Sequence, residues 1–175
     1  MRFASYRLLG CAALAAFGLN TAAAAGDIAA YGGQQFSEGD NFNTLAVSAG
    51  FDLFPLSPIE LRSDFTYAFR SDDLGGFGDL DQNIYYGHVG PAFTFDPFIG
   101  FDVSVGAQAG VAVIDTELNG FDDTDAHFSY QFPVAVDFPI APRFSIGARY
   151  RPLFISIDGD QELEHVLEGG IRFKF

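Results

Sequence analysis

The stretch His127-Phe128-Ser129 holds two residue types that together can do nucleophilic chemistry. A histidine can take the hydroxyl proton of a serine, provided that an acidic group orients the histidine and all three side chains are aligned. On a β-strand, His127 and Ser129 would lie on the same side as Asp137, because side chains alternate between the two faces. The spacing alone does not align them. These residues, like His88, would also suit a polar interior in which they hydrogen-bond to their neighbours.

Asp115-x-Glu117-x-Asn119-Gly120 has the spacing of metal ligands. It matches the first half of a calcium-binding loop, D-x-[DN]-x-[DN]-G, with a glutamate at the second ligand position. The second half differs, because the twelfth position is Ala126 rather than a bidentate glutamate. Two hypotheses follow: a calcium site formed by Asp115, Glu117 and Asn119, or a solvated acidic surface that binds divalent cations loosely. We predict no other cofactor, since the chain has no phosphate-binding loop, dinucleotide motif or zinc spacing.

Acidic side chains concentrate in four polar stretches rich in Gly, Asp and Asn, at 37–44, 71–81, 115–125 and 158–161. This composition is typical of loops. The stretches contain no lysine or arginine, so their carboxylates would repel each other unless cations screen or bridge them. The acids in and beside these stretches are Glu38, Asp40, Asp72, Asp73, Asp79, Asp81, Asp115, Glu117, Asp122, Asp123, Asp125, Asp158, Asp160 and Glu162.

Three shorter breaks at 55–58, 96–97 and 139–143 contain proline, which cannot continue a central β-ladder, so we interpret them as tight turns. Polar stretches and tight turns alternate along the chain and separate eight runs. This layout predicts an all-β fold, an eight-stranded antiparallel up-and-down β-barrel with both termini at one rim. The expected strands are 27–36, 45–54, 59–70, 82–95, 98–114, 126–138, 144–157 and 162–175; small residues leave the faces of the first undefined.

Residues 1–25 have the pattern of a secretory signal peptide. Arg2 and Arg7 precede an apolar run from Leu8 to Leu19, and small residues follow up to Ala25. Cys11 would carry a lipid in a lipoprotein, but it follows Arg7 too closely for an apolar run to precede it. Residues 26–175 would then form one domain with no cysteine, seven basic residues and 23 acidic ones.

The chain is 49% hydrophobic, yet it has no internal apolar run of the ~20 residues that a transmembrane helix needs. This leaves a soluble β-barrel or sandwich, or a barrel of the outer membrane. The alternation distinguishes them. One face of the runs is too bulky for the interior of an eight-stranded barrel, whereas the other mixes charged residues with Gly and Ser. The bulky face of run 126–138, for example, is Phe128, Tyr130, Phe132, Val134, Val136 and Phe138.

The charges on the second face nearly balance, as the lumen of a membrane barrel requires, because buried charges must be paired. The acids there are Asp52, Glu60, Asp64, Asp102, Asp137, Glu164 and Glu168, and the bases are Arg62, Arg70, Arg149, Arg151, Arg172 and Lys174. We therefore predict a transmembrane barrel with a charge network in its lumen. Its candidate members are Glu60, Arg62, Asp64, Asp102, Arg149, Arg151, Glu168 and Arg172.

Aromatic residues favour the same topology, because membrane barrels carry an aromatic girdle at each interface. One expected girdle lies beside the tight turns, at Phe93, Phe95, Phe138, Phe144, Phe173 and Phe175. The other lies toward the polar stretches, at Tyr67, Phe69, Tyr85, Phe128, Tyr130 and Tyr150.

The last strand, LEGGIRFKF, ends in aromatic-x-aromatic. Together with the signal peptide and eight alternating strands, it resembles the small OmpA/OmpX-like barrels of Gram-negative bacteria. The resemblance implies residence in the outer membrane, contact with its lipids and lipopolysaccharide, and recognition by the barrel assembly machinery. It also implies that Gly169, Ile171, Phe173 and Phe175 form the assembly signal. Nothing in the chain resembles the peptidoglycan-binding domain of full-length OmpA or the long loops of opacity-type adhesins.

The His-x-Ser pair also resembles that of the lipid A deacylases, which are barrels of this size. Their catalytic groups face the lipid and include an acidic partner. Here the alternation assigns His127 and Ser129 to the lumen, and run 126–138 has no glutamate to complete the set. This departure favours a polar lumen over catalysis.

Three functional hypotheses follow. The leading one is a non-enzymatic barrel with a structural or surface-interaction role and an acidic extracellular rim. The first alternative is a narrow pore for ions or small solutes, and the second is a lipid A-modifying enzyme. The acidic charge makes nucleic acid an improbable partner. The oligomeric state stays open.

Overall fold

The computed structural model describes residues 26–37, 40–53, 58–73, 79–98, 100–118, 121–157 and 159–175. The expected signal peptide at 1–25 lies outside these ranges. Within them, no helix has the length and apolar character needed to cross a membrane.

Strands make up almost all of the described chain. They are β1 (Gly26–Phe36), β2 (Asn41–Asp52), β3 (Ile59–Asp73), β4 (Asp79–Phe98), β5 (Phe101–Gly106), β6 (Gln108–Leu118), β7 (Phe121–Gln131), β8 (Val134–Ala141), β9 (Phe144–Ile157) and β10 (Asp160–Lys174).

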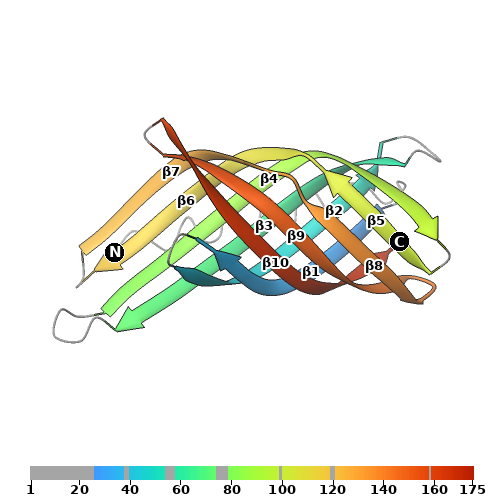
Figure 1. Cartoon of the computed structure of the whole chain (residues 1–175), viewed down its shortest axis with the longest axis horizontal. Helices are drawn as coiled ribbons and strands as arrows, with labels where there is room; N and C mark the ends of the chain where they lie inside the picture. Colours follow the sequence, from blue (N-terminus) through green and yellow to red (C-terminus); the bar gives the residue numbers. More distant parts are fainter. Residues whose placement is uncertain are drawn as a thin grey trace.

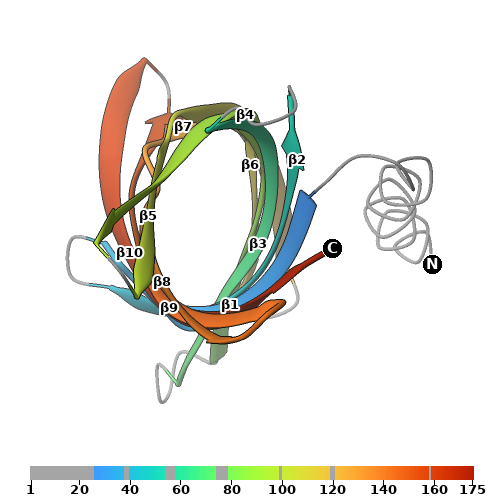
Figure 2. The same cartoon turned by 90° about the vertical axis from the view of Figure 1, so that its right-hand side faces the viewer.

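The strands close into a ring. All pairings are antiparallel: β1 to β4 pair in chain order, β4 pairs with β5 and β6, these pair with β8 and β7, and β9 pairs with β7, β8 and β10. β1 pairs with β10 along its length, from Asp27 opposite Lys174 to Phe36 opposite His165. Figure 1 shows the tilted strands from the side, and Figure 2 looks into the ring. The predicted antiparallel barrel is confirmed.

The ring consists of eight wall segments, because two of them are divided in the middle into two strands each. β4 pairs with both β5 and β6, and β9 pairs with both β7 and β8, and the register is the same on both sides of each division. β5 with β6 and β7 with β8 are therefore halves of single segments, interrupted at Ala107 and at Phe132-Pro133. The expected strands 98–114 and 126–138 are these two segments.

We call the end of the barrel with Gly26 and Phe175 the terminal end. Gly26 and Phe175 exchange backbone hydrogen bonds there, and the turns between β4 and β5 and between β8 and β9 lie at the same end. Gly100 in the first of these turns has φ 121°, a conformation that favours glycine. The opposite end, where β1–β2, β3–β4, β6–β7 and β9–β10 are joined, is the hairpin end.

The prediction that the four polar stretches are loops is wrong for most of their residues. β6 continues to Leu118 and β7 starts at Phe121, and β3 and β4 run to Asp73 and from Asp79. The register continues as well, with Glu117 opposite Asp122. Composition misled here because a ladder outside the membrane needs backbone pairing but no apolar face, so Asp- and Thr-rich sequence can extend a hairpin.

The β3–β4, β6–β7 and β9–β10 hairpins project at the hairpin end (Figure 1). Beyond Phe69, β3 pairs only with β4. β7 pairs with β9 only from Phe128 to Gln131, so the part of β7 before Phe128 is held by β6 alone. Likewise β10 before His165 pairs only with β9. Six of the twelve residues in these parts of β7 and β10, 121–127 and 160–164, are acidic.

The outer surface of the barrel wall is apolar, as the alternation predicts. Large apolar side chains from every segment are exposed, whereas the alternate positions are buried. An exposed band this continuous is the surface that a membrane barrel presents to lipid. Its members include Ile28, Leu45, Val47, Leu61, Val89, Val111, Phe128, Val134, Ile146, Leu167 and Ile171.

Aromatic side chains on the outer surface stack in pairs toward both ends. Phe93 contacts Phe95 and Phe144 contacts Phe173 toward the terminal end. Toward the hairpin end, tyrosines also have polar partners: Tyr67 donates to Asn83 at 2.6 Å, and the Tyr150 hydroxyl lies 2.7 Å from His165 Nδ1. A ring with a polar tip suits the boundary between lipid and water.

The lumen is filled in two layers. Toward the hairpin end, buried apolar side chains from opposite walls pack into one cluster: Phe42, Ala68, Ile84, Tyr86, Ala112, Leu153, Ile155 and Val166. The middle and the terminal end are filled by charged side chains. The alternation did not predict the apolar layer. It assigns each side chain to the lumen or to the outer surface, but it does not give the position of that side chain along the barrel axis.

Candidate functional site

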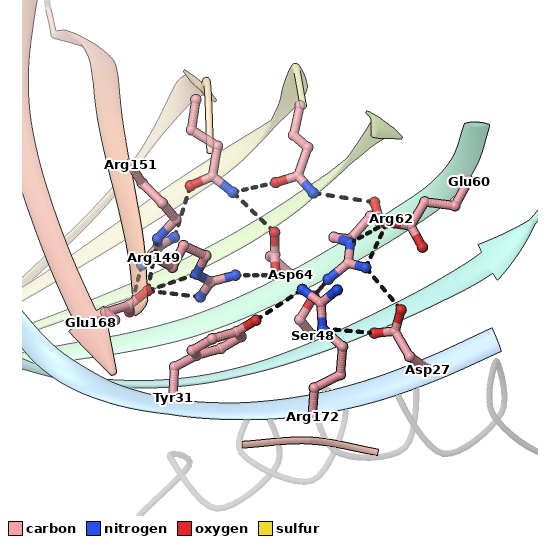
Figure 3. Close-up of polar contacts among 12 residues, drawn as sticks. Asp27, Tyr31, Ser48, Glu60, Arg62, Asp64, Arg149, Arg151, Glu168 and Arg172 are labelled. Atoms are coloured by element: carbon pink, nitrogen blue, oxygen red, sulfur yellow. Dashed lines mark hydrogen bonds and ion pairs between the residues drawn. The ribbon is translucent and has the colours of Figure 1, made fainter. Parts of the chain in front are cut away.

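The charged layer of the lumen contains two groups of ion pairs. The central cluster is Asp64 on β3, Arg149 and Arg151 on β9, and Glu168 on β10. The terminal cluster is Asp27 on β1, Glu60 and Arg62 on β3, Asp137 on β8 and Arg172 on β10. Alternation positions all these side chains, since each occupies an inward position of its strand. Figure 3 shows the central cluster and, of the terminal cluster, Asp27, Glu60, Arg62 and Arg172.

Arginines on β9 hold the central cluster together. Arg149 donates to Asp64 Oδ1 at 2.7 Å and to Glu168 Oε2 at 2.9 Å. Arg151 donates hydrogen bonds to both carboxylate oxygens of Glu168, at 2.8 and 3.0 Å. Such charge-assisted, two-point pairing fixes the orientation of both groups.

Arg62 and Arg172 organise the terminal cluster. Arg62 lies 2.6 Å from Glu60 and 2.9 Å from Asp27. Arg172 lies 3.1 Å from Asp137 and 3.7 Å from Asp27. Asp27 thus connects the two arginines, and the cluster joins the first strand to the last.

Neutral side chains bridge the two clusters. Arg151 donates to Gln131 at 2.7 Å, Gln131 donates to Gln108, and Gln108 donates to the Arg62 carbonyl at 3.5 Å. On the other side, the guanidinium of Arg149 lies 4.0 Å from the centre of the Tyr31 ring, whose hydroxyl accepts from Arg172 at 3.2 Å. Because the partners come from opposite walls, the network crosses the lumen.

Burial makes this pairing obligatory. None of the nine ionisable residues in the two clusters is more than 6% exposed. They comprise five acids and four arginines, so their charges balance within one unit. An unpaired charge at this burial would carry a large desolvation penalty.

The structure brings together seven of the eight predicted members: Glu60, Arg62, Asp64, Arg149, Arg151, Glu168 and Arg172. Asp102 is the exception. It forms its ion pair with Lys174 at 2.7 Å, and the two side chains are 23% and 46% exposed. Asp102 therefore lies at the rim of the terminal end, where the lumen opens to solvent.

Sequence reasoning missed Asp27 and Tyr31, because small residues in GDIAAYGGQQF hid the faces of the first strand. Asp27, Tyr31 and Gln35 share one parity and are all buried. Their polar side chains, spaced four residues apart, were the available signal for the inward face.

The nucleophile candidates do not come together as a catalytic set. Ser129 is buried in the lumen with 0% exposure, and its hydroxyl lies 2.9 Å from Nε2 of His88 rather than from His127. A group buried there cannot meet a lipid on the outer surface. The pair acts as a polar contact within the lumen.

The candidate calcium residues lie on a ladder instead of a loop. Asp115 and Glu117 occupy β6, and Asp115 accepts a hydrogen bond from Thr124 on β7 at 3.1 Å. Asn119 lies outside the described residues. No cluster of three His, Cys, Asp or Glu able to hold a metal occurs in the described part of the chain.

One arginine, Arg70, lies at the hairpin end beside the four acidic stretches, which themselves contain no lysine or arginine. Arg70, next to the stretch 71–81, forms ion pairs with Asp40 and with Asp72, the latter at 2.6 Å. These are the only ion pairs at this end among the described residues. The described acidic side chains on the projecting parts of β6, β7 and β10 thus have no lysine or arginine partner there.

The predicted assembly signal lies on the closing strand. Gly169 and Ile171 face outward from β10, and Ile171 is 59% exposed. The Phe173 ring contacts the ring of Phe144 on β9, with 4.9 Å between centroids and a tilt of 49°, and the backbone of Phe175 pairs with Gly26. These positions are accessible from the outer surface, and their role in assembly stays a prediction.

Comparisons with known proteins agree with this architecture. Residues 9–175 match the family model described as outer membrane protein beta-barrel domain. A search of curated proteins gives no match.

Three solved structures resemble the fold. Neisserial surface protein A has a TM-score of 0.68 at 17% identity, covering 86% of this chain and 96% of its own. The N-terminal barrel of Pseudomonas aeruginosa OprF scores 0.61 at 16% identity, covering 86% and 97%. Yersinia pestis Ail, solved with the heparin analogue sucrose octasulfate, scores 0.56 at 17% identity, covering 85% and 97%.

A closed antiparallel ring with an apolar outer surface needs a lipid environment, and the family model covers residues 9–175. The protein is therefore an integral β-barrel of the bacterial outer membrane, and the chain belongs to the outer membrane protein β-barrel domain family.

Proposed function

We propose that this barrel is a closed membrane anchor that works through its hairpin end, where an acidic rim binds divalent cations and, through them, the phosphates of lipopolysaccharide. One observation carries the proposal. The charges of the two lumen clusters balance within one unit, whereas the hairpin end carries many carboxylates and, among its described residues, a single arginine, Arg70. The arginines of the clusters are occupied by buried acids, so the carboxylates of the hairpin end are left for external partners.

The hairpin end faces the cell exterior in this proposal. Bacterial outer-membrane barrels have short periplasmic turns and longer extracellular connections. The terminal end has the tight turns, and the hairpin end has the projecting β6–β7 and β9–β10 hairpins. Residues 1–25 would serve as the signal peptide, and Gly169, Ile171, Phe173 and Phe175 would be recognised by the barrel assembly machinery.

Divalent cations fit this surface better than anions do. The outward face of the β6–β7 hairpin carries Asp115 and Glu117, and no described lysine or arginine contacts them. Carboxylates and lipid phosphates repel each other, and a hard divalent cation joins them through oxygen ligands. The sulfated ligand of Yersinia pestis Ail is an anion, so an analogous site is not expected on these hairpins.

The two alternatives have less support. A pore would need a continuous aqueous path, but the apolar cluster and the ion-pair network both span the lumen. A lipid A-modifying enzyme would need a nucleophile at the lipid surface, but Ser129 is wholly buried. A non-enzymatic role therefore fits better.

The proposal is tested by electrophoretic mobility of the folded protein, reconstituted with lipopolysaccharide, with calcium or with EDTA. Calcium should raise the temperature at which the fast-migrating folded band converts to the unfolded band. The double substitution Asp115→Asn with Glu117→Gln should reduce this calcium effect. Asp102→Asn, at the opposite end, is the matched control and should keep it. A conversion temperature independent of calcium in the unmodified protein would refute the proposal.

A further inference from the structure

Three prolines lie in the wall of the barrel rather than in its turns. Pro91 is on β4, Pro133 joins β7 to β8, and Pro152 is on β9. The register, which continues across these positions, places Pro91 opposite Ala107, Pro133 opposite Gly106, and Pro152 opposite Phe132. These positions cross four neighbouring segments at one depth.

Each of these pairs retains one backbone hydrogen bond. Ala107 donates to the Pro91 carbonyl at 3.1 Å, Gly106 to the Pro133 carbonyl at 2.9 Å, and Phe132 to the Pro152 carbonyl at 3.1 Å. The return bonds cannot form, because proline has no N–H. The carbonyl of Gly106 therefore has no ladder donor in a part of the wall where lipid offers none either.

A small cavity lies directly against the Gly106–Pro133 pair. Both residues line it, together with Ser104 and the side chains of Arg62, Arg149 and Arg172. The volume in which the centre of a water molecule can lie is about 10 Å³, which is enough for one water molecule. Ala92, Val105 and Ala135 complete a lining whose surface is largely apolar. Its charged members, the three arginines, are only 2–4% exposed.

Two arginines that line the cavity each have one nitrogen without a hydrogen-bond partner: Nη2 of Arg149 and Nε of Arg172. Nη2 of Arg149 is 2.8 Å from Glu168 Oε2 but is not aligned for a hydrogen bond, and Nε of Arg172 is 3.7 Å from Asp27 Oδ1. Both nitrogens are donors, and the Gly106 carbonyl is an acceptor.

We propose that this cavity binds one water molecule, which accepts hydrogen bonds from Arg149 and Arg172 and donates one to the Gly106 carbonyl. The water replaces the N–H that Pro133 lacks and ties the interrupted wall to the arginine network. A small anion fits less well, because the lumen clusters already contain five acids against four arginines. A neutral molecule that both accepts and donates matches the groups present.

A crystal structure of the whole protein, grown with sodium bromide, tests the identity of the ligand. The expected result is one water within about 3.2 Å of the Gly106 oxygen and of one guanidinium nitrogen. An anomalous bromide peak would reassign the site to an anion and overturn the proposal. A cavity without density would overturn it as well.

Nuclear Overhauser contacts between water and the Gly106 α-protons in detergent micelles provide a second test. The proposal predicts a contact with a long-lived water in the unmodified protein. Ala135→Val, which fills the cavity, should abolish it. Pro91→Ala should retain it, because Pro91 does not line the cavity. Absence of the contact in the unmodified protein would contradict the proposal even if Ala135→Val fails to fold.

Discussion

Arg149 is the residue on which the central cluster depends most. It bonds Asp64 and Glu168 at once and is 2% exposed. Arg149→Met would leave Asp64 without its shortest ion pair and Glu168 with Arg151 alone. We expect a loss of about 3–5 kcal/mol in the free energy of unfolding, measured by urea denaturation in lipid vesicles.

Lys174→Met is the control for this substitution. It also removes one partner of an ion pair, but the pair with Asp102 is partly exposed, with the lysine 46% accessible. The expected loss is below about 1 kcal/mol. Equal effects of the two substitutions would show that burial does not determine the strength of these pairs.

Gly50 is required by the terminal cluster. A β-carbon on Gly50 would lie 2.7 Å from Glu60 Oε2 and 3.0 Å from both Arg62 Nη2 and Asp27 Oδ2. Gly50→Ala should displace these groups and lower the free energy of unfolding by about 1–3 kcal/mol.

Gly87→Ala provides the comparison, because a β-carbon there meets no atom within 4 Å. Its free energy of unfolding should stay within about 0.5 kcal/mol of the unmodified protein, as for most surface substitutions. The account of the terminal cluster is wrong if Gly50→Ala is tolerated equally well.

At the scale of residues, the sequence predicts which side chains face the lumen but not which of them form ion pairs with each other. Alternation assigned Arg62, Arg149 and Glu168 to one face because the strand period is two. It could not tell that Arg151 grips Glu168 or that Arg62 meets Asp27, since those pairs depend on the register between strands distant in the sequence. It also placed Asp102 in the network, because parity does not reveal the depth at which the lumen opens to solvent.

At the scale of the elements, the β6–β7 hairpin is longer than its composition suggests. Its ladder continues to Leu118 opposite Phe121. We expect backbone amides within 115–118 and 121–125 to exchange with deuterium at least about tenfold more slowly than in a synthetic peptide of the same sequence. Equal exchange rates would mean that these residues form a loop.

Proline was interpreted as a marker of turns, and the structure shows that this holds for only some of the prolines. Most of the predicted turn at 55–58 lies outside the described residues. The predicted turn at 139–143 is confirmed for Pro142 and Arg143, whereas Asp96-Pro97 and Pro139 lie at the ends of β4 and β8, and Pro91 and Pro152 lie within the wall. A barrel wall tolerates them because each faces a neighbour that still donates one bond. The rule that proline leaves a central ladder therefore separates turns from strands only where the register is known.

At the scale of the whole molecule, the apolar outer surface should penalise charge according to depth. Val47 and Asn43 are both on β2 and face outward, with Asn43 nearer the hairpin end. Val47→Arg should cost about 2–4 kcal/mol in vesicles, whereas Asn43→Arg should cost about 0–1 kcal/mol. Equal costs would contradict a membrane that is centred on the apolar band.

The central claim is that the lumen is closed, so that the protein acts through its surface. Recording from the purified barrel in planar lipid bilayers tests this most directly. We predict no steady single-channel conductance, because the apolar cluster and the arginine network block the path in series. Steady conductance steps whose size changes in Arg149→Met or Arg151→Met would contradict the claim and establish a pore lined by those arginines.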